Sequence, residues 1–129
     1  MSSSGAQRRA TRVLIVNDFV DAADSLALLL RRLGFDVRAV YDGAAALVEA
    51  AEFVPQAILL DLALPRLDGF QVAIRLRENP ALQNACLIAL SGFGQAADRE
   101  RTRGAGFDFH LLKPVNLDDL RRLLETLPR

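Results

Sequence analysis

The sequence predicts a doubly wound α/β protein, in which five parallel strands form one sheet and helices cover both of its faces. Five short apolar runs have the length of strands, at residues 13–16, 37–40, 57–60, 86–90 and 109–112. Helical patterns lie between and after these runs, so strand and helix alternate, as they do around a parallel sheet. The runs are rich in Leu, Ile and Val without clean alternation, which is typical of strands buried on both faces.

The first two helices are predicted from apolar periodicity and from residues that start or stop a helix. The first is expected to have Asp21 as its N-cap and to stop at Gly34. Leucines at helical spacing form its expected inner face: Leu26, Leu29, Leu30 and Leu33. The second helix is expected to cover about 44–52.

Three further helices complete the predicted alternation. The third begins near Asp68-Gly69 and is expected to direct Phe70, Ala73 and Ile74 inward. The fourth, at about 95–103, is mostly charged. The fifth begins at a cap on Asn116, and its inner face consists of Leu117, Leu120, Leu123, Leu124 and Leu127.

Length and composition exclude several classes of protein. The chain has 129 residues, so we expect a disordered N-terminal tail over 1–11 and a single domain over 12–129. Its 16 basic and 16 acidic residues balance, which argues against nucleic-acid binding. The single cysteine, Cys86, excludes an internal disulfide and fits a reducing compartment. No apolar run approaches the roughly 18 residues of a membrane span, and no signal peptide is visible, so we expect a cytoplasmic protein without membrane contact.

Polar side chains follow four of the predicted strands. They are Asn17-Asp18 after the first, Asp61 in the third, Ser91-Gly92 after the fourth and Lys113-Pro114 after the fifth. Ligands of open α/β sheets bind at the carboxyl ends of the strands. If these four strands are neighbours, the polar side chains converge on one pocket.

Each of these residues also has a purely structural explanation. Asp18 is a possible helix cap, although Asp21 fits that role better, and Ser91-Gly92 alone indicates only a turn. Asp61 is a lone charge in an apolar stretch, where burial without a partner is costly. Lys113 is the only lysine among 16 basic residues, so its compact ammonium at a strand end favours a specific role.

The set of groups suits phosphoryl transfer. A carboxylate can act as a nucleophile and form an acyl phosphate. The reaction chiefly needs in-line positioning and stabilisation of charge on the phosphoryl oxygens. Mg²⁺ held by one or two carboxylates, a lysine ammonium and a hydroxyl would supply that stabilisation.

At this point the chain resembles the receiver domain of bacterial two-component response regulators, over about residues 12–127. The matching motifs are "VLIVND", "ILLDLALPRLDGF", "LIALSG" and "GFDFHLLKPV", in family order and spacing. The resemblance implies a flavodoxin-like, CheY-like sheet in the order 2-1-3-4-5. It also implies that a phosphohistidine, on a sensor histidine kinase or a histidine phosphotransfer domain, donates its phosphoryl group to Asp61.

The resemblance further assigns a role to each site residue. Asp18, Asp61 and the backbone carbonyl of Ala63 would bind Mg²⁺. Lys113 would contact the phosphate and precede a cis peptide bond to Pro114. Ser91 would be the hydroxyl that moves toward the phosphoryl group and signals the switch.

The sequence departs from the family pattern at three positions. Asn17 replaces the first of two acids, so it would reach the metal only through a bound water, and we expect weaker Mg²⁺ binding. His110 stands where a Tyr or Phe often reports the switch; it is either a partly exposed side chain at the partner face or a pH-sensitive or phosphorylatable residue. Gly92 replaces a common Ala, which still leaves room for a phosphate.

Three functions remain open on the sequence alone. The first is a signalling receiver, not an enzyme in the usual sense, although it would assist its own phosphorylation and dephosphorylation. Its output would be altered binding of a downstream protein or a homodimer, through the face formed by the fourth helix, fifth strand and fifth helix. The second is a phosphorylation-independent interaction module, favoured only by Asn17. The third is a small α/β enzyme or flavin binder, but the second acid of a dehalogenase-type phosphatase is here Ala63, and "NDFVDA" is not a phosphate loop.

Overall fold

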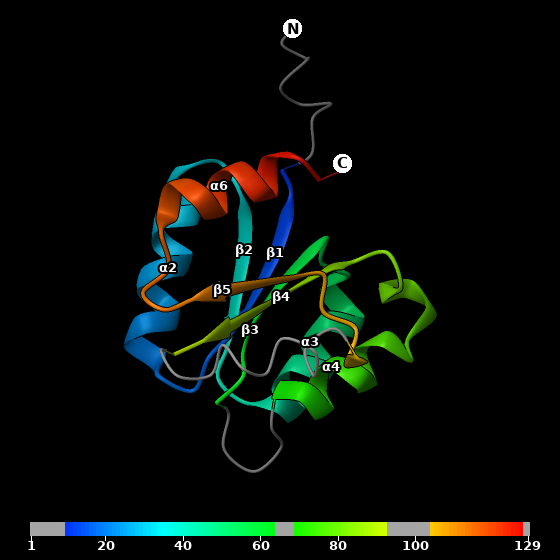
Figure 1. Ribbon diagram of the computed structural model, residues 1–129. Helices are drawn as coiled ribbons and strands as arrows, with labels where there is room; N and C mark the ends of the chain where they lie inside the picture. Colours follow the sequence, from blue (N-terminus) through cyan, green and yellow to red (C-terminus); the bar gives the residue numbers. More distant parts are fainter. Residues whose placement is uncertain (1–9, 64–68, 93–103, 128–129) are drawn as a thin grey trace, which may run out of the picture.

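The chain folds around one parallel sheet, shown in Figure 1 as a computed structural model that describes residues 10–63, 69–92 and 104–127. Its strands are β1 (Arg12–Val16), β2 (Asp36–Val40), β3 (Ala57–Asp61), β4 (Cys86–Ser91) and β5 (Phe109–Leu112). Their order is β2-β1-β3-β4-β5, and every neighbouring pair is parallel. The predicted strands and their order are therefore confirmed.

Four α-helices and one short 3₁₀-helix lie in the described part of the chain. They are α2 (Val20–Arg32), α3 (Gly43–Phe53), α4 (Gly69–Arg77), α6 (Leu117–Glu125) and the 3₁₀-helix η1 (Pro80–Leu82). Residues 1–9 of the tail predicted over 1–11, and the predicted charged helix at 95–103, lie outside the described residues. The tail prediction was wrong for Thr11, which is buried and whose carbonyl accepts a hydrogen bond from Asp36 N at 2.9 Å. None of the described helices has the length and apolar character needed to cross a membrane.

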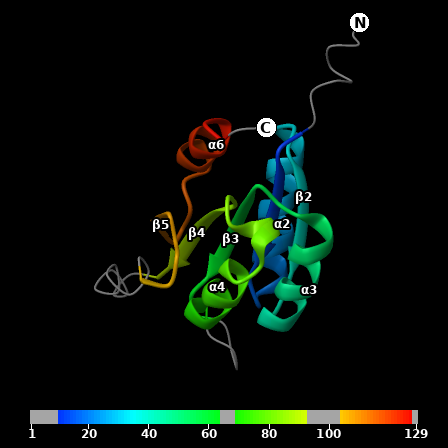
Figure 2. The same ribbon diagram turned by 90° about the vertical axis from the view of Figure 1, so that its right-hand side faces the viewer.

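The helices form a layer on each face of the sheet, with α2 and α6 on one side and α3 and α4 on the other (Figure 2). Because successive strand residues point to opposite faces, each strand contributes to two cores. In β1, Val13 and Ile15 belong to the core under α2 and α6, whereas Leu14 and Val16 belong to the core under α3 and α4. The central strands are thus covered on both sides, as the apolar runs without clean alternation predicted.

The inner face of α2 differs from the prediction. Small residues spaced for a helix, Ala23 and Ala27 together with Leu30, are buried against the sheet. Leu29 and Leu33 are 42% and 43% exposed, so the predicted leucine face was wrong for these two positions. The small alanine side chains allow α2 to lie close to the sheet. The helix therefore packs on its alanine face, and Leu29 and Leu33 lie outside the contact.

The ends of α2 were predicted with mixed success. Gly34 stops the helix as expected, since it adopts a left-handed φ of +100° that favours glycine. The predicted N-cap was wrong, because the helix begins one residue earlier than Asp21 and the N-cap is Phe19 without a side-chain cap bond. Asp21 lies inside the first turn, where its negative charge still favours the helix dipole.

The other helices agree more closely with their predicted bounds. Asn116 caps α6 as predicted, since its side chain accepts a hydrogen bond from Asp119 N, and Leu120 and Leu124 are fully buried. In α4, Phe70 and Ala73 are buried as expected, but Ile74 is 48% exposed and its predicted inward position was wrong. The inner positions of this short helix are filled by Val72 and Leu76 instead.

Candidate functional site

The carboxyl ends of four adjacent strands bring the predicted polar residues to one edge of the sheet (Figure 1). Asp61 is the last residue of β3 and Ser91 the last residue of β4. Asn17 and Asp18 follow β1, and Lys113 follows β5. Because parallel strands all end on the same side of the sheet, the fold brings these polar residues together, as the sequence predicted.

Asp61 is a buried carboxylate with a partner on each oxygen. Its residue is 2% exposed. The Lys113 ammonium Nζ lies 2.9 Å from Oδ2, and the backbone N–H of Ala63 donates to Oδ1 at 2.9 Å. Burial of an unpaired charge would be costly, and these two donors offset that cost. The family resemblance implied a metal-binding role for the Ala63 carbonyl. In this structure the group of Ala63 that contacts Asp61 is its backbone N–H.

Lys113 is fixed from the backbone as well as through its side chain. Its N–H donates to the carbonyl of Ser91 at 2.7 Å, and its peptide bond to Pro114 is cis, as expected from the family. The lysine side chain is 35% exposed, so its ammonium lies between solvent and the buried Asp61. A single lysine thus reaches across from β5 to β3.

Asn17 shapes the chain where it leaves β1. Its side-chain oxygen accepts a hydrogen bond from the Phe19 N–H at 3.0 Å, and its own N–H donates to the Val40 carbonyl at 3.1 Å. The first contact is an Asx-turn, which leads the chain into α2. Asn17, and not Asp21, is therefore the polar side chain that directs the chain into this helix.

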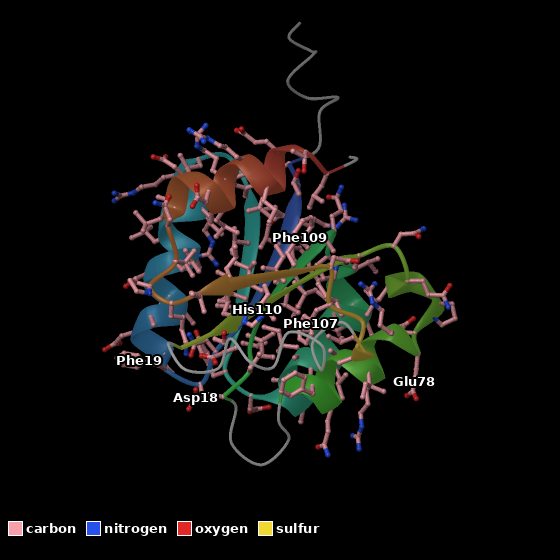
Figure 3. The ribbon with its side chains drawn as sticks, in the orientation of Figure 1. Asp18, Phe19, Glu78, Phe107, Phe109 and His110 are labelled. Carbon is pink, nitrogen blue, oxygen red and sulfur yellow. The ribbon has the colours of Figure 1, made fainter. Side chains whose placement is uncertain are left out.

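Asp18 is exposed at the same end of the sheet, beside Phe19 (Figure 3). Together with the buried carboxylate of Asp61 and the carbonyl of Ala63, it offers only oxygen donors, the type that Mg²⁺ prefers. No group of three His, Cys, Asp or Glu side chains suited to a metal occurs within the described ranges, so carbonyl and water oxygens would complete the coordination of a metal held by Asp18 and Asp61. The oxygen donors that are present fit Mg²⁺, and two of them, Asp18 and Asp61, carry a charge.

Ser91 and His110 contact each other across the β4–β5 pair. Ser91 is fully buried, and its hydroxyl forms a short hydrogen bond with Nε2 of His110, which is itself only partly exposed. Sequence reasoning proposed both as switch residues but missed this bond. The pairing register contains the missing information, since His110 lies opposite Ala89 and diagonally beside Ser91.

The single cysteine and the charged residues of α6 lie away from this site. Cys86 is buried at the start of β4, and burial raises the pKa of its thiol to about 11, which favours the neutral and unreactive form. The charged residues predicted for the fourth helix, Asp98, Arg99, Glu100, Arg101 and Arg103, lie outside the described residues. On α6, Arg121 approaches Asp118 at 3.7 Å and Glu125 at 3.6 Å within the same helix.

Comparison with known proteins identifies the family of this fold and site. The family model described as response regulator receiver domain matches residues 13–125. The chain belongs to this family. Receiver domains are signalling domains of two-component systems, so the resemblance inferred from the motifs is confirmed.

Individual relatives agree with this receiver assignment. PilG of Pseudomonas aeruginosa is 31% identical, over 88% of this chain and 84% of its own. The transcriptional regulatory protein PrrA of Mycobacterium tuberculosis is 40% identical over 92% of this chain, which spans only 50% of PrrA. Receiver domains thus occur both in proteins of this size and within longer regulators.

Solved structures support both the fold and the type of site. The chemotaxis protein CheY4 of Vibrio cholerae superposes with a TM-score of 0.86 over 93% of this chain and 100% of its own; at 22% identity it supports the fold alone. The receiver domain of the sensor histidine kinase PA1611 of Pseudomonas aeruginosa is 32% identical, with a TM-score of 0.81 over 91% of this chain and 96% of its own. That structure holds a magnesium ion in its active-site cleft.

Proposed function

We propose that this receiver accepts a phosphoryl group on Asp61 from a phosphohistidine and that phosphorylation changes its binding to other proteins. The observation that carries the proposal is the buried Asp61 carboxylate, contacted by the Lys113 ammonium at 2.9 Å. The Asp61 carboxylate is only 2% exposed and adds nothing to the packing of the apolar core. A buried, paired charge at the carboxyl end of a central strand therefore favours a functional role. The proposed donor is a sensor histidine kinase or a histidine phosphotransfer domain.

The proposed reaction is an in-line displacement. A carboxylate oxygen of Asp61 attacks phosphorus, the bond from phosphorus to the donor imidazole nitrogen breaks, and an acyl phosphate forms. Lys113 neutralises part of the negative charge on the phosphoryl oxygens, and Ser91 offers a hydroxyl hydrogen bond. When bound by Asp18, Asp61 and the Ala63 carbonyl, Mg²⁺ would supply further charge stabilisation.

The proposed output surface includes β5. This edge strand leaves Phe109 46% exposed and Leu112 42% exposed, so it presents apolar side chains along this edge of the sheet, with Leu112 directly before Lys113 (Figure 3 labels Phe109). His110 lies on the same strand, and Lys113 directly follows it. A change in contacts at the site therefore has a short route to a surface that suits a downstream protein or a second copy of the receiver.

Incubation with acetyl phosphate and Mg²⁺ tests the proposed phosphorylation. Intact-mass measurement is expected to show one added phosphoryl group on the wild type and none on Asp61→Asn, because the amide is not a nucleophile. The Asp61→Asn variant keeps size and shape, so it is also the control for non-specific labelling. No added mass on the wild type at high Mg²⁺ would instead favour the phosphorylation-independent module that Asn17 suggests.

Asn17→Asp is expected to tighten Mg²⁺ binding about tenfold, because affinity for such cations increases with the charge of the ligand set. The carboxylate still accepts the hydrogen bond from Phe19 N, so the turn into α2 is retained. Isothermal titration of Mg²⁺ into both proteins measures the change, with Asp18→Asn as a control that should weaken binding. Equal affinities of wild type and Asn17→Asp would show that residue 17 does not influence the metal.

A further inference from the structure

The hydrogen bond between Ser91 and His110 uses the hydroxyl that the proposed function assigns to the phosphoryl group. Ser91 has no exposed surface, so its hydroxyl cannot exchange partners with bulk water. Within the described residues, this hydroxyl forms its hydrogen bond with His110 Nε2. Any hydrogen bond from Ser91 to a group on Asp61 therefore competes with the imidazole.

The protonation state of the imidazole decides how the Ser91 hydroxyl proton is used. A hydroxyl has one proton to donate, whereas a neutral imidazole has one nitrogen that donates and one that accepts. When Nε2 accepts, the Ser91 proton points at His110. A protonated imidazole donates from both nitrogens, so Ser91 then accepts from Nε2 and its own proton is free for another acceptor.

We propose that His110 is a proton-coupled positioning residue, which frees the Ser91 hydroxyl for the phosphoryl group of Asp61 when the imidazole takes up a proton. The inference rests on the proposed phosphorylation of Asp61. One proton enters from solvent onto the imidazole, the hydroxyl proton of Ser91 rotates from Nε2 toward a phosphoryl oxygen, and no covalent bond changes. Imidazole is the side chain that changes charge between about pH 5 and pH 8, so the switch would respond to physiological pH.

In the described part of the chain, two ion pairs lie on the elements next to β5. On the side of the site, Asp61 of β3 is paired with Lys113, which follows β5. At the opposite end of β5, Asp108 is paired with Arg77 of α4 at 2.8 Å. On β4 the polar neighbour is the neutral Ser91.

Phosphorylation disturbs this balance of paired charges. A phosphoryl group adds negative charge next to Lys113, which stabilises a positive imidazole nearby. By linkage, a lower pH then favours the phosphorylated, switched state, and the effect is lost as the imidazole deprotonates at higher pH. A phenylalanine at residue 110 would lack this dependence, because its ring has no titratable group.

His110 is the only histidine of the chain, so its imidazole resonances can be assigned without ambiguity. The test is an NMR titration between about pH 5.5 and pH 8, with Mg²⁺ alone and with Mg²⁺ plus beryllofluoride, a stable mimic of the phosphoryl group. We expect beryllofluoride to raise the pKa of the imidazole in the wild type. Ser91→Ala retains the charge of the mimic but lacks the hydroxyl, so its rise should be distinctly smaller.

Beryllofluoride affinity supplies a second, independent readout. From about pH 8 to pH 6 the affinity of the wild type should increase about tenfold relative to His110→Phe, which removes the background from the carboxylates. An equal pKa rise in wild type and Ser91→Ala, or parallel pH profiles of wild type and His110→Phe, would overturn the inference. Absence of beryllofluoride binding at every pH would overturn the proposed function itself, and these two failures are distinct.

Discussion

Replacing Gly69 with alanine is expected to lower the free energy of unfolding by about 2 kcal/mol and to impair phosphorylation of Asp61. Gly69 begins α4 and lies against the end of β3. A Cβ atom there would lie 2.8 Å from the carbonyl oxygen of Asp61 and 2.8 Å from Cα of Leu62. Both atoms belong to the backbone, so no rotation of a side chain can relieve the clash.

The effect on function follows from the position of the clash. To admit the extra methyl group, either the start of α4 or the end of β3 must move, and the end of β3 carries Asp61, the proposed nucleophile. Its carboxylate is held to Lys113 at 2.9 Å, and a displacement of a few tenths of an ångström would disturb that contact. Gly69→Ala should therefore take up phosphoryl from acetyl phosphate more slowly, even under conditions where it is folded.

Gly104→Ala is the matched control for this experiment. A Cβ atom at Gly104 meets no atom within 4 Å, so the same chemical change there should leave both stability and phosphorylation near the wild-type values. Urea denaturation gives the stabilities, and the time course of intact mass gives the rates. Equal stabilities of Gly69→Ala and Gly104→Ala would show that the two backbone segments can separate without cost.

The fold was predictable because its strands are short and mostly apolar. The five runs match the observed strands to within one residue at each end. The central strands β3 and β4 are buried along their whole length and carry a polar side chain only at the strand end, whereas the edge strands β2 and β5 contain Arg38 and His110.

The inner faces of single helices were less predictable. In α2, apolar residues such as Leu28 and Leu29 remain 49% and 42% exposed, while Ala23 and Ala27 contact the sheet. Hydrophobicity alone does not reveal how closely a helix approaches its sheet.

The site residues were predictable in type and position, but their contacts were not. A lone Asp61 in an apolar strand and a lone Lys113 at a strand end indicated a functional pair, and they lie 2.9 Å apart. The turn made by Asn17 with Phe19 N, and the bond between Ser91 and His110, depend on side-chain orientation and strand register. Register follows from the packed sheet as a whole, so sequence patterns alone could not supply it.

Arg77 is a second residue whose role emerges only from the structure. It lies in the last turn of α4, with its side chain 22% exposed. Its guanidinium donates to the carboxylate of Asp108. It also donates to four backbone carbonyls, which belong to Leu82, Gln83, Ala85 and Gly106. These partners come from η1 and the chain after it, and from the residues that lead into β5. One side chain thus holds three segments together.

Arg77→Ala is expected to lower the free energy of unfolding by about 3 kcal/mol, because several partly buried carbonyls lose their donor at once. The Asp108 carboxylate would keep only its bond from Leu87 N–H, at 3.0 Å. Arg75→Ala is the control, since Arg75 lies in the same last turn but is exposed, and its loss should cost less than about 0.5 kcal/mol. Denaturant unfolding of the two variants compares them directly.

The loss of Arg77 should also loosen β5, the strand that carries the proposed switch residue His110. Gly106 and Asp108 immediately precede β5, which presents His110 to Ser91 and leads to Lys113. We therefore expect amide hydrogen exchange in β5 to accelerate in Arg77→Ala and to stay at the wild-type rate in Arg75→Ala. Faster exchange spread evenly over the whole sheet would indicate a general loss of stability, whereas unchanged exchange and stability would show that the Arg77 contacts contribute nothing measurable. A local effect on β5 would mean that a residue at the opposite end of the sheet fixes the position of the site.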